Sequence, residues 1–401
     1  MKVLQINSVC GIRSTGRICT DLAEILKSHG HECKIAYGRE QVPEKFKEDA
    51  YRIGSNKDVI IHAFFSRIFD NSGFLSKKAT KKFISWAREY NPDIIHLHNI
   101  HGYYINIEML FNFLAEFNKP VIWTMHDCWA FTGHCSHFDY VNCEKWKEGC
   151  FCCSQKKEYP TSLLMDRAKK NYFKKKRIFN SVDDLTIVAV SDWLKTVLEA
   201  SFLKKFTIKR IYNGIDLKSF TPTRTDVLKK YGLDEYNIIL GVASAWSKKK
   251  GLDIFLKLNE KLDKKYKIVL VGIDDETKKS IPDDILCINK TNDIGELSEL
   301  YSSAKVFLNP SYEETMGLTT VEALACGTPV IVSNRTALPE CVDENCGVVV
   351  DCTNIELLSN AIYKVCNDEK YNEEVCVNRA KSFDKFEKYE EYIDLYMRCL
   401  K

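Results

Sequence analysis

The sequence predicts an α/β protein with two doubly wound parallel sheets in series. Two observations carry this prediction. Short apolar runs alternate with amphipathic helical segments along the chain, and the alternation starts afresh at Ile238. A length of 401 residues is sufficient for two separate hydrophobic cores. We therefore expect two domains that face each other across a cleft.

The first series opens with a strand over Lys2–Asn7, a loop over Ser8–Gly16 and an amphipathic helix over Ile18–Ser28. A strand at Cys33–Tyr37 completes a β-loop-α-β unit. The same alternation predicts strands at 93–98, 120–125 and 185–190, and helices at 107–117 and 192–200.

The second series predicts strands at 238–243, 267–271, 285–288, 305–309 and 328–332, and helices at 252–262 and 294–303. A turn at Asn213-Gly-Ile-Asp216 separates the two series. We expect Rossmann-like domains over 1–212 and 213–380. The amphipathic helix in 381–401 needs an apolar partner and is expected to return to the first domain.

Composition narrows the class of protein. Hydrophobic residues make up 45% and charged residues 28%, and 58 basic residues against 55 acidic ones give a net charge of +3. These values are those of an ordinary soluble protein and give no ground for nucleic-acid binding. The first residues form a polar-interrupted strand rather than a signal peptide, so we expect a cytoplasmic protein whose 17 cysteines are mostly reduced.

The stretch Pro310–Gly327 follows a predicted strand and forms a loop and a short helix. It places Glu314 in the loop and Glu322 in the first helical turn, with Thr319 as the expected N-cap and Glu313 as a solvated loop charge. In parallel sheets, ligands bind at this edge, where a helix N-terminus attracts anions. Two carboxylates beside a phosphate-binding helix N-terminus suit a sugar nucleotide, which has hydroxyl groups on both sides of its diphosphate. For Glu322 a capping box is the alternative role.

Several pieces together carry a resemblance: a glycine-containing first loop, His126-Asp127, Asn213-Gly-Ile-Asp216, Lys250-Gly251, and Glu314-x7-Glu322 followed by Ala-Cys-Gly-Thr-Pro. In this order the chain resembles the retaining nucleotide-sugar glycosyltransferases of family 4 (group 1), which have the two-domain GT-B fold. The resemblance implies a nucleoside-diphosphate sugar donor and no catalytic metal. It also implies a glycan or lipid-linked acceptor in bacterial exopolysaccharide, capsule or O-antigen synthesis.

The resemblance assigns roles on the donor side. It implies that Glu322 binds the ribose hydroxyls, Glu314 contacts the transferred sugar, and Gly317 and Leu318 offer backbone N–H groups. Lys250 matches a lysine that neutralises the diphosphate.

The arginine that the family places five or six residues before this lysine is absent, because Ser244 and Ala245 stand there. Lys248 or Lys249 could supply the charge without the bidentate geometry of arginine. The alternative is that Lys248–Lys250 is a solvated basic turn.

On the acceptor side, His126 resembles a histidine that lies over the transferred sugar, with Asp127 able to orient the imidazole; a hydrogen-bonded core histidine is the alternative. His96 and His98 can be satisfied interior histidines or site residues, and His98-Asn99 at the strand end is the better acceptor-side candidate of the two positions. Gly16 belongs to the early loop, which would face the diphosphate or the acceptor, although the usual paired glycines are missing.

A cysteine-rich insert occupies about 128–160. Its spacing suggests a structural zinc site formed by Cys135, Cys143, Cys150 and Cys153. Free thiols and a redox or disulfide role are the alternatives.

The segment 167–177 combines seven basic residues with Tyr172 and Phe173. It suits peripheral contact with anionic lipid on the inner face of the membrane, and a solvated helix face is the alternative. Two other functions fit the same architecture: a sugar-nucleotide epimerase, or a non-catalytic binding protein that uses the cysteine-rich insert.

Overall fold

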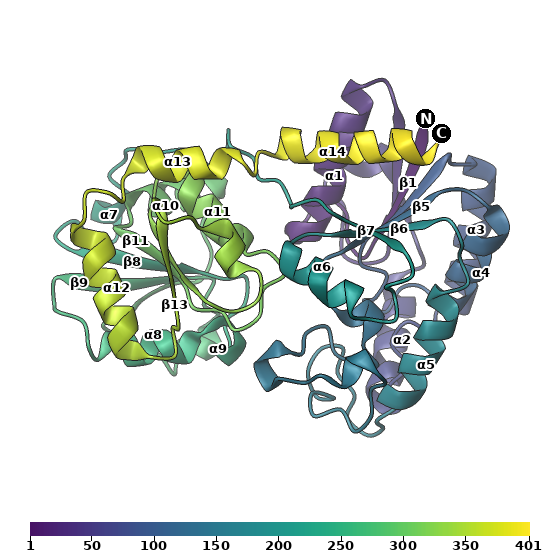
Figure 1. The fold of residues 1–401 in the computed structure, drawn as a ribbon, viewed down its shortest axis with the longest axis horizontal. Coiled ribbons are helices and arrows are strands. Elements are labelled where there is room, and N and C mark those ends of the chain that lie inside the picture. Colours follow the sequence, from purple (N-terminus) through teal and green to yellow (C-terminus); the bar gives the residue numbers. More distant parts are fainter. The chain divides into compact units, whose positions relative to one another are not determined.

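The computed structural model describes all 401 residues and divides into two compact units. The N-terminal unit comprises Met1–Tyr212 together with Lys388–Lys401, and the C-terminal unit comprises Asn213–Glu387. Each unit is a parallel sheet with helices on its faces (Figure 1). The predicted α/β class with two parallel sheets is confirmed.

The N-terminal unit has a seven-stranded sheet in the order β3-β2-β1-β4-β5-β6-β7, and every pair is parallel. The chain runs outward from β1 to β3 and then returns to the other side of β1 with β4. The strands are β1 (Lys2–Asn7), β2 (Glu32–Tyr37), β3 (Ala50–Arg52), β4 (Ile94–Leu97), β5 (Val121–Met125), β6 (Leu185–Ala189) and β7 (Thr207–Arg210).

Helices α1 and α14 pack apolar side chains against the sheet of this unit. The C-terminal helix α14 supplies Tyr389, Tyr392 and Tyr396 to the same core as α1 and β2. The hydroxyl of Tyr396 bonds to His96 Nδ1 at 2.6 Å. The helices are α1 (Arg13–Ser28), α2 (Asn56–Phe69), α3 (Lys77–Tyr90), α4 (Ile107–Phe117), α5 (Ala168–Phe179), α6 (Asp192–Glu199) and α14 (Lys385–Cys399).

The C-terminal unit has a six-stranded parallel sheet in the order β10-β9-β8-β11-β12-β13. The strands are β8 (Asn237–Val242), β9 (Tyr266–Val271), β10 (Leu286–Ile288), β11 (Val306–Asn309), β12 (Val330–Ser333) and β13 (Gly347–Val350). The helices are α7 (Val227–Lys230), α8 (Leu252–Asn259), α9 (Asp275–Lys278), α10 (Ile294–Ser303), α11 (Leu318–Ala325), α12 (Ile355–Asn367) and α13 (Glu373–Lys381).

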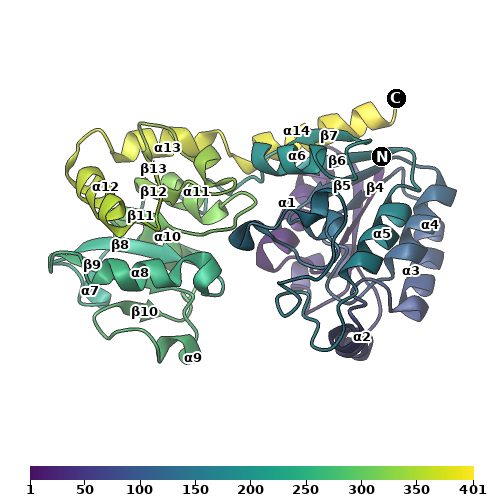
Figure 2. The same ribbon diagram turned by 60° about the horizontal axis from the view of Figure 1, so that its bottom comes forward.

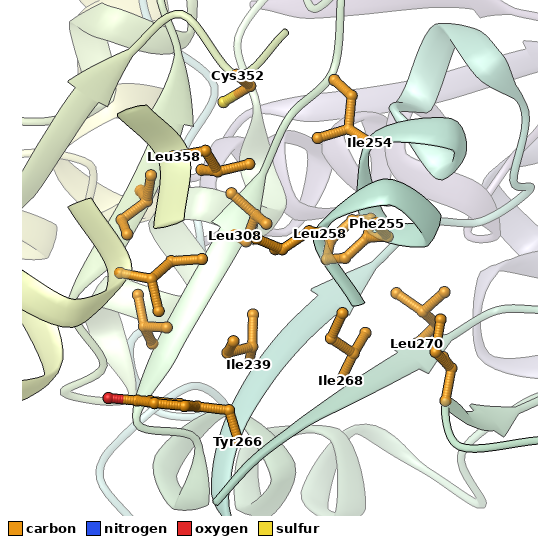
Figure 3. Close-up of a cluster of buried hydrophobic side chains, with 14 of the residues drawn as sticks. Ile239, Ile254, Phe255, Leu258, Tyr266, Ile268, Leu270, Leu308, Cys352 and Leu358 are labelled. Carbon is orange, nitrogen blue, oxygen red and sulfur yellow. The ribbon is translucent and has the colours of Figure 1, made fainter. Parts of the chain in front are cut away.

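One core of this unit lies between the sheet and helices α8 and α12. Figure 3 shows Ile239, Ile268 and Leu308 from the strands meeting Phe255 from α8 and Leu358 from α12. All five side chains are buried, so both helices are fixed on the sheet. The loops at the strand ends therefore start from a rigid base.

One predicted boundary is wrong. The loop expected over Ser8–Gly16 ends early, because α1 begins at Arg13 and Gly16 lies in its first turn. A Cβ at Gly16 would lie 3.1 Å from Val9 Cγ2 and 3.2 Å from the Gly11 nitrogen. Glycine at position 16 therefore allows α1 to pack closely against the loop that precedes it.

Candidate functional site

The C-terminal unit has a topological switch point between β8 and β11. These neighbouring strands are followed by chain segments that leave toward opposite sides of the sheet, and ligands of such sheets bind in the crevice at that point. The two loops contact each other, since Tyr312 N donates to Lys249 O at 2.9 Å. Gly251 has a φ of +75° and a Cβ there would lie 2.6 Å from Pro310 Cγ, which explains glycine after Lys250.

Two lysine–glutamate pairs join these loops. Lys250 Nζ lies 2.5 Å from Glu314 Oε1, and Lys249 Nζ lies 3.5 Å from Glu313 Oε2. The Glu314 side chain keeps 18% exposure, whereas that of Glu313 keeps only 4%. The expectation that Glu313 is a solvated loop charge is therefore wrong, because this carboxylate is buried against Lys249.

Helix α11 begins at Leu318, and its N-cap is Gly317 with a φ of +82°. The expected N-cap at Thr319 is wrong, since this residue already lies inside the helix. No side chain caps the N-terminus, so its first amides and the positive end of the helix dipole are suited to an anion. Gly317 and Leu318 thus lie at the helix start, three and four residues after Glu314.

Glu322 does not form the capping box. Its Oε2 accepts a hydrogen bond from Tyr301 OH at 3.0 Å. Burial, followed by the Glu322 charge, raises the pKa of Tyr301 well above its usual value, so the hydroxyl stays protonated and donates. Tyr301 thereby orients Glu322 from α10.

Exposed residues stand where the family places its arginine. Ser244 and Ala245 are both exposed, and Lys248 is exposed in the short 3-10 turn Lys248–Lys250. The loop after β12 adds a residue that the sequence reasoning missed: Thr336 Oγ1 accepts from Glu314 N at 3.0 Å. Thr336 could have been found from the sequence, because it follows a predicted buried strand and therefore lies at the same edge of the sheet.

The N-terminal unit has its own switch point, between β1 and β4. Asn7 ends β1, and its Oδ1 accepts from Asn99 N at 3.2 Å. His98 follows β4 directly. Its Nε2 lies 3.0 Å from Gln5 Oε1, and its Nδ1 lies 3.0 Å from Nε2 of His126 after β5. A hydrogen-bonded chain thus runs from the buried Gln5 and His98 to the partly buried His126.

The direction of this chain follows from its first member. Gln5 Nε2 donates to Cys19 O at 2.8 Å, so its oxygen faces His98. His98 Nε2 must then carry a proton, His98 Nδ1 must accept, and His126 Nε2 must donate. Burial lowers the pKa of His126 to about 4, so the ring is neutral and its Nδ1 is an acceptor.

Asp127 orients a different imidazole from the expected one. Its Oδ2 lies 2.6 Å from Nε2 of His101, whose Nδ1 lies 3.1 Å from Tyr159 OH. Although burial alone would raise it, the pKa of Asp127 is lowered to about 2, with His101 the largest opposing influence. His101 and Tyr159 were missed because no local pattern links them to Asp127.

Gly16 is buried in α1, and its carbonyl accepts from Gly11 N at 3.0 Å. Its own role is therefore structural support of the first loop. A donor contact by Gly16 stays a prediction.

In the cysteine-rich insert, all four candidate zinc ligands are free thiols. Cys135, Cys143, Cys150 and Cys153 line one cavity of about 20 Å³, the size of about one water molecule. However, no group of three or more His, Cys, Asp or Glu side chains is arranged to hold a metal ion. The four thiols share this cavity without forming a preassembled metal site, and zinc binding stays a prediction.

One thiol of the insert differs from the others. A hydrogen bond from Cys135 lowers the pKa of Cys153 to about 6, and His134 contributes to the shift. His134 Nδ1 is held by Asp70 Oδ1 at 2.7 Å in a buried pair. The insert is thus fixed to the end of α2 through Asp70.

The basic segment 167–177 corresponds to the start and body of α5. Lys175 is buried, and its Nζ donates to Trp129 O at 2.7 Å. Lys174 and Arg177 both pair with Glu108 of α4. Several of its cations therefore hold the helix in place. No helix in the structure has the length and apolar composition required to cross a bilayer.

Two family models match the chain. The model described as "Glycosyltransferase Family 4" matches residues 15–219, more than half of the chain, and "Glycosyl transferases group 1" matches residues 223–383.

Among solved structures, sucrose-phosphate synthase from Thermosynechococcus elongatus superposes with a TM-score of 0.72 and 18% identity, over 99% of this chain and 98% of that one. Anabaena HepE in complex with UDP-glucose gives 0.66 and 16%, over 99% and 100%. These similarities establish the fold, which is GT-B.

Two curated relatives align over part of their length. An Escherichia coli K12 protein provisionally assigned to colanic acid biosynthesis as the glycosyl transferase WcaC is 26% identical over 198 residues, 45% of this chain and 46% of that protein. The Campylobacter jejuni N,N'-diacetylbacillosaminyl-diphospho-undecaprenol alpha-1,3-N-acetylgalactosaminyltransferase is 28% identical over 202 residues, 47% and 53% respectively. The chain thus spans about half the length of these relatives.

The two switch points and two parallel sheets define a protein of the GT-B class. The chain belongs to the family 4 glycosyltransferases, also described as group 1.

Proposed function

We propose that the protein is a retaining glycosyltransferase that moves a sugar from a nucleoside-diphosphate sugar to a glycan or lipid-linked oligosaccharide. The observation that carries this proposal is the pairing of Lys250 with Glu314 at 2.5 Å beside the uncapped N-terminus of α11. A cation, a carboxylate and free helix amides at one switch point match a ligand with both phosphates and hydroxyls.

The donor would lie in the C-terminal unit. In this proposal Lys250 and the amides of Gly317 and Leu318 bind the diphosphate, and Lys248 supplies the charge that the absent arginine gives in the family. Glu314 accepts hydroxyls of the transferred sugar, while Glu322, held by Tyr301, accepts ribose hydroxyls. UDP and UDP-glucose bound to a protein of the same fold support a nucleotide-sugar ligand.

We place the acceptor in the N-terminal unit near His126, whose ring is neutral and is held through Nε2 by His98. A neutral imidazole can accept a sugar hydroxyl without adding charge beside the reacting carbon. We assign His126 a positioning role there, since its low pKa makes it a weak base.

The reaction would proceed on one face of the sugar. The acceptor oxygen forms the new bond to the anomeric carbon as the bond from that carbon to the donor phosphate oxygen breaks. The acceptor proton passes to the departing phosphate, so the nucleoside diphosphate leaves and the configuration is retained. Lys250 and the α11 amides stabilise its developing charge. We propose that this transfer needs no metal ion.

The acceptor class follows from the relatives. One is provisionally assigned to colanic acid biosynthesis, and another is named for an undecaprenol diphosphate-linked acceptor. We propose a role in bacterial polysaccharide synthesis in the cytoplasm or on the inner face of the membrane.

The test is transfer of label from a panel of nucleotide sugars to endogenous glycan and lipid acceptors in membrane extracts, after a thermal-shift screen for the donor. We expect labelled, acid-labile glycan product with the α-anomeric configuration when the donor is α-linked. Epimerised donor without transfer would replace this proposal with the isomerase, and absence of any nucleotide-sugar binding would support a non-catalytic protein.

A further inference from the structure

Helix α2 exposes its apolar face and buries its polar one. Ile60, Ile61 and Phe64 are 66%, 55% and 57% exposed, and Phe65 is also exposed. The buried side of the same helix carries His62, together with Ala63 and Ser66. An ordinary surface helix shows the opposite arrangement. This face therefore needs an apolar environment outside the unit.

The rotation of α2 is fixed by its buried polar groups. His62 Nδ1 lies 2.8 Å from Ser76 Oγ, and His62 Nε2 accepts from Gly73 N at 3.3 Å. A capping box between Ser55 and Asp58 fixes the helix start. Turning the helix to bury Ile61 and Phe64 would break these bonds, so the apolar face is held outward.

A second segment extends this face. Leu163 N donates to Arg67 O at 2.7 Å, and Met165 N donates to Ile68 O at 3.2 Å, so residues 163–165 lie along the C-terminal end of α2. Leu163, Leu164 and Met165 are all exposed, Leu164 to 70%. Figure 2 shows α2 at an outer edge of the N-terminal unit. The exposed residues of α2 and 163–165 form one surface, the α2 face.

Basic side chains border the α2 face. Lys57 and Arg67 are exposed on α2 itself, and the Arg167 guanidinium lies 5.9 Å from the ring centre of Phe69. Lys169 and Lys170 follow, exposed, at the start of α5. The two acidic residues of these segments are tied to backbone amides: Asp58 caps α2, and Asp166 accepts from Cys153 N and Ala168 N.

We propose that the α2 face docks on an anionic lipid bilayer. Aromatic and aliphatic side chains on one helix face with lysine and arginine beside them are the composition of an interfacial membrane-binding surface. A second copy of the chain fits less well. A two-fold dimer through this face would bring its basic border near the equally basic border of the second copy, where like charges repel. The inference rests on this surface alone and not on sugar transfer.

The test is sedimentation of the full chain with vesicles that contain no glycan and no nucleotide sugar. We expect strong binding to phosphatidylglycerol-containing vesicles, weak binding to phosphatidylcholine vesicles, and loss of binding at high salt. The variant Ile61→Ser/Phe64→Ser/Leu164→Ser should lower the partition coefficient at least about tenfold. The variant Lys57→Gln/Arg67→Gln/Lys170→Gln should remove the preference for phosphatidylglycerol.

A matched control is Val349→Ser/Leu357→Ser, which removes exposed apolar side chains from the C-terminal unit and should bind like the parent. Circular dichroism melts verify folding, and Leu164→Ser alone replaces the triple variant if that variant is unfolded. Absence of binding to phosphatidylglycerol vesicles, or unchanged binding of the serine variant, would overturn the proposal. A dimer in sedimentation that the serine variant dissociates would also overturn it.

Discussion

The two units share the strand order around their switch points but place opposite chemistry there. In the C-terminal unit, Lys250 pairs with Glu314 and Lys249 with Glu313, and the unit contains no histidine. In the N-terminal unit, His98 and His126 form a neutral chain with Gln5.

All nine histidines lie between residues 29 and 137. Two units with the same strand order in one chain can therefore carry charged side chains at one switch point and neutral side chains at the other. Formal charges suit a diphosphate, whereas neutral hydrogen-bonding groups suit a hydroxyl that must not be deprotonated early.

The largest difference between the units should be their response to acid. Burial lowers the pKa of His62 and His126 to about 4 and that of His96 to about 3, and it lowers the pKa of His98 well below the usual value. In the unfolded chain these groups bind protons near pH 6.5, whereas the folded N-terminal unit does not until the pH is much lower. Stability should therefore rise with pH across this window and level off above it.

At pH 5 the free energy of unfolding should be lower than at pH 7 by about 2 kcal/mol for each such histidine. His134 should instead add stability at low pH, because Asp70 raises the pKa of this histidine despite its burial. Hydrogen exchange at pH 5 should show the N-terminal unit opening before the C-terminal one. Equal protection of both units at pH 7 and pH 5 would contradict the assignment of neutral histidines.

The next effect concerns the charged site. Glu314→Gln keeps the shape of the side chain and removes its charge, and kcat/KM for transfer should fall by about 10²- to 10³-fold. The protein should remain folded, since Glu314 is only partly buried. Glu344→Gln, at an exposed position of the same unit, is the control and should leave transfer unchanged. Normal turnover of Glu314→Gln would remove this residue from the site.

A smaller effect should separate the neighbouring lysines. Lys250→Met should raise KM for the donor by about 10- to 100-fold, the range of a lost charge-assisted hydrogen bond. Lys250→Arg keeps the positive charge, so its KM for the donor should lie between those of the parent and Lys250→Met. Lys248→Met should have a weaker effect, since this side chain is exposed and a lysine in water acts only as a screened point charge. Initial transfer rates at varied donor concentration give both KM values, and a larger increase in Lys248→Met would reverse the two roles.

The smallest expected effect is a difference in alkylation rate between thiols of the two units. A hydrogen bond from Cys135 lowers the pKa of Cys153, whereas burial raises the pKa of Cys326 and Cys366 to about 11. At pH 7, iodoacetamide should therefore modify Cys153 faster than Cys326 or Cys366, because its thiolate fraction is larger. Peptide mass spectrometry locates the label. Protection of Cys153 together with one equivalent of bound zinc would instead establish the predicted metal site.

The sequence predicted where the candidate residues of the C-terminal unit lie, because the signals for their placement are local. Glu314 and Glu322 follow a buried strand at a fixed spacing, and Lys250 precedes a glycine that a close backbone approach requires. Local signals failed where two choices had similar propensity. Thr319 and Gly317 both suit an N-cap, and the chain took the glycine because the loop turns with positive φ there.

The N-terminal site could be predicted less completely, because its partners come from separate segments. Asp127 bonds His101 rather than His126, and Tyr159 reaches His101 from the insert. Nothing in the spacing of these residues shows that they meet. Their contacts follow from the order of β4 and β5 in the sheet and from the path of the insert.

The sequence by itself determined the α/β class, the restart at Ile238, the acidic pair Glu314 and Glu322, and an amphipathic C-terminal helix. Each is written in local periodicity or spacing, which depends on neighbouring residues alone. The tertiary structure decided that Glu313 is buried, that His126 is neutral, and that α2 turns its apolar face outward. These properties depend on which distant groups surround a side chain, and burial sets both its charge and its exposure.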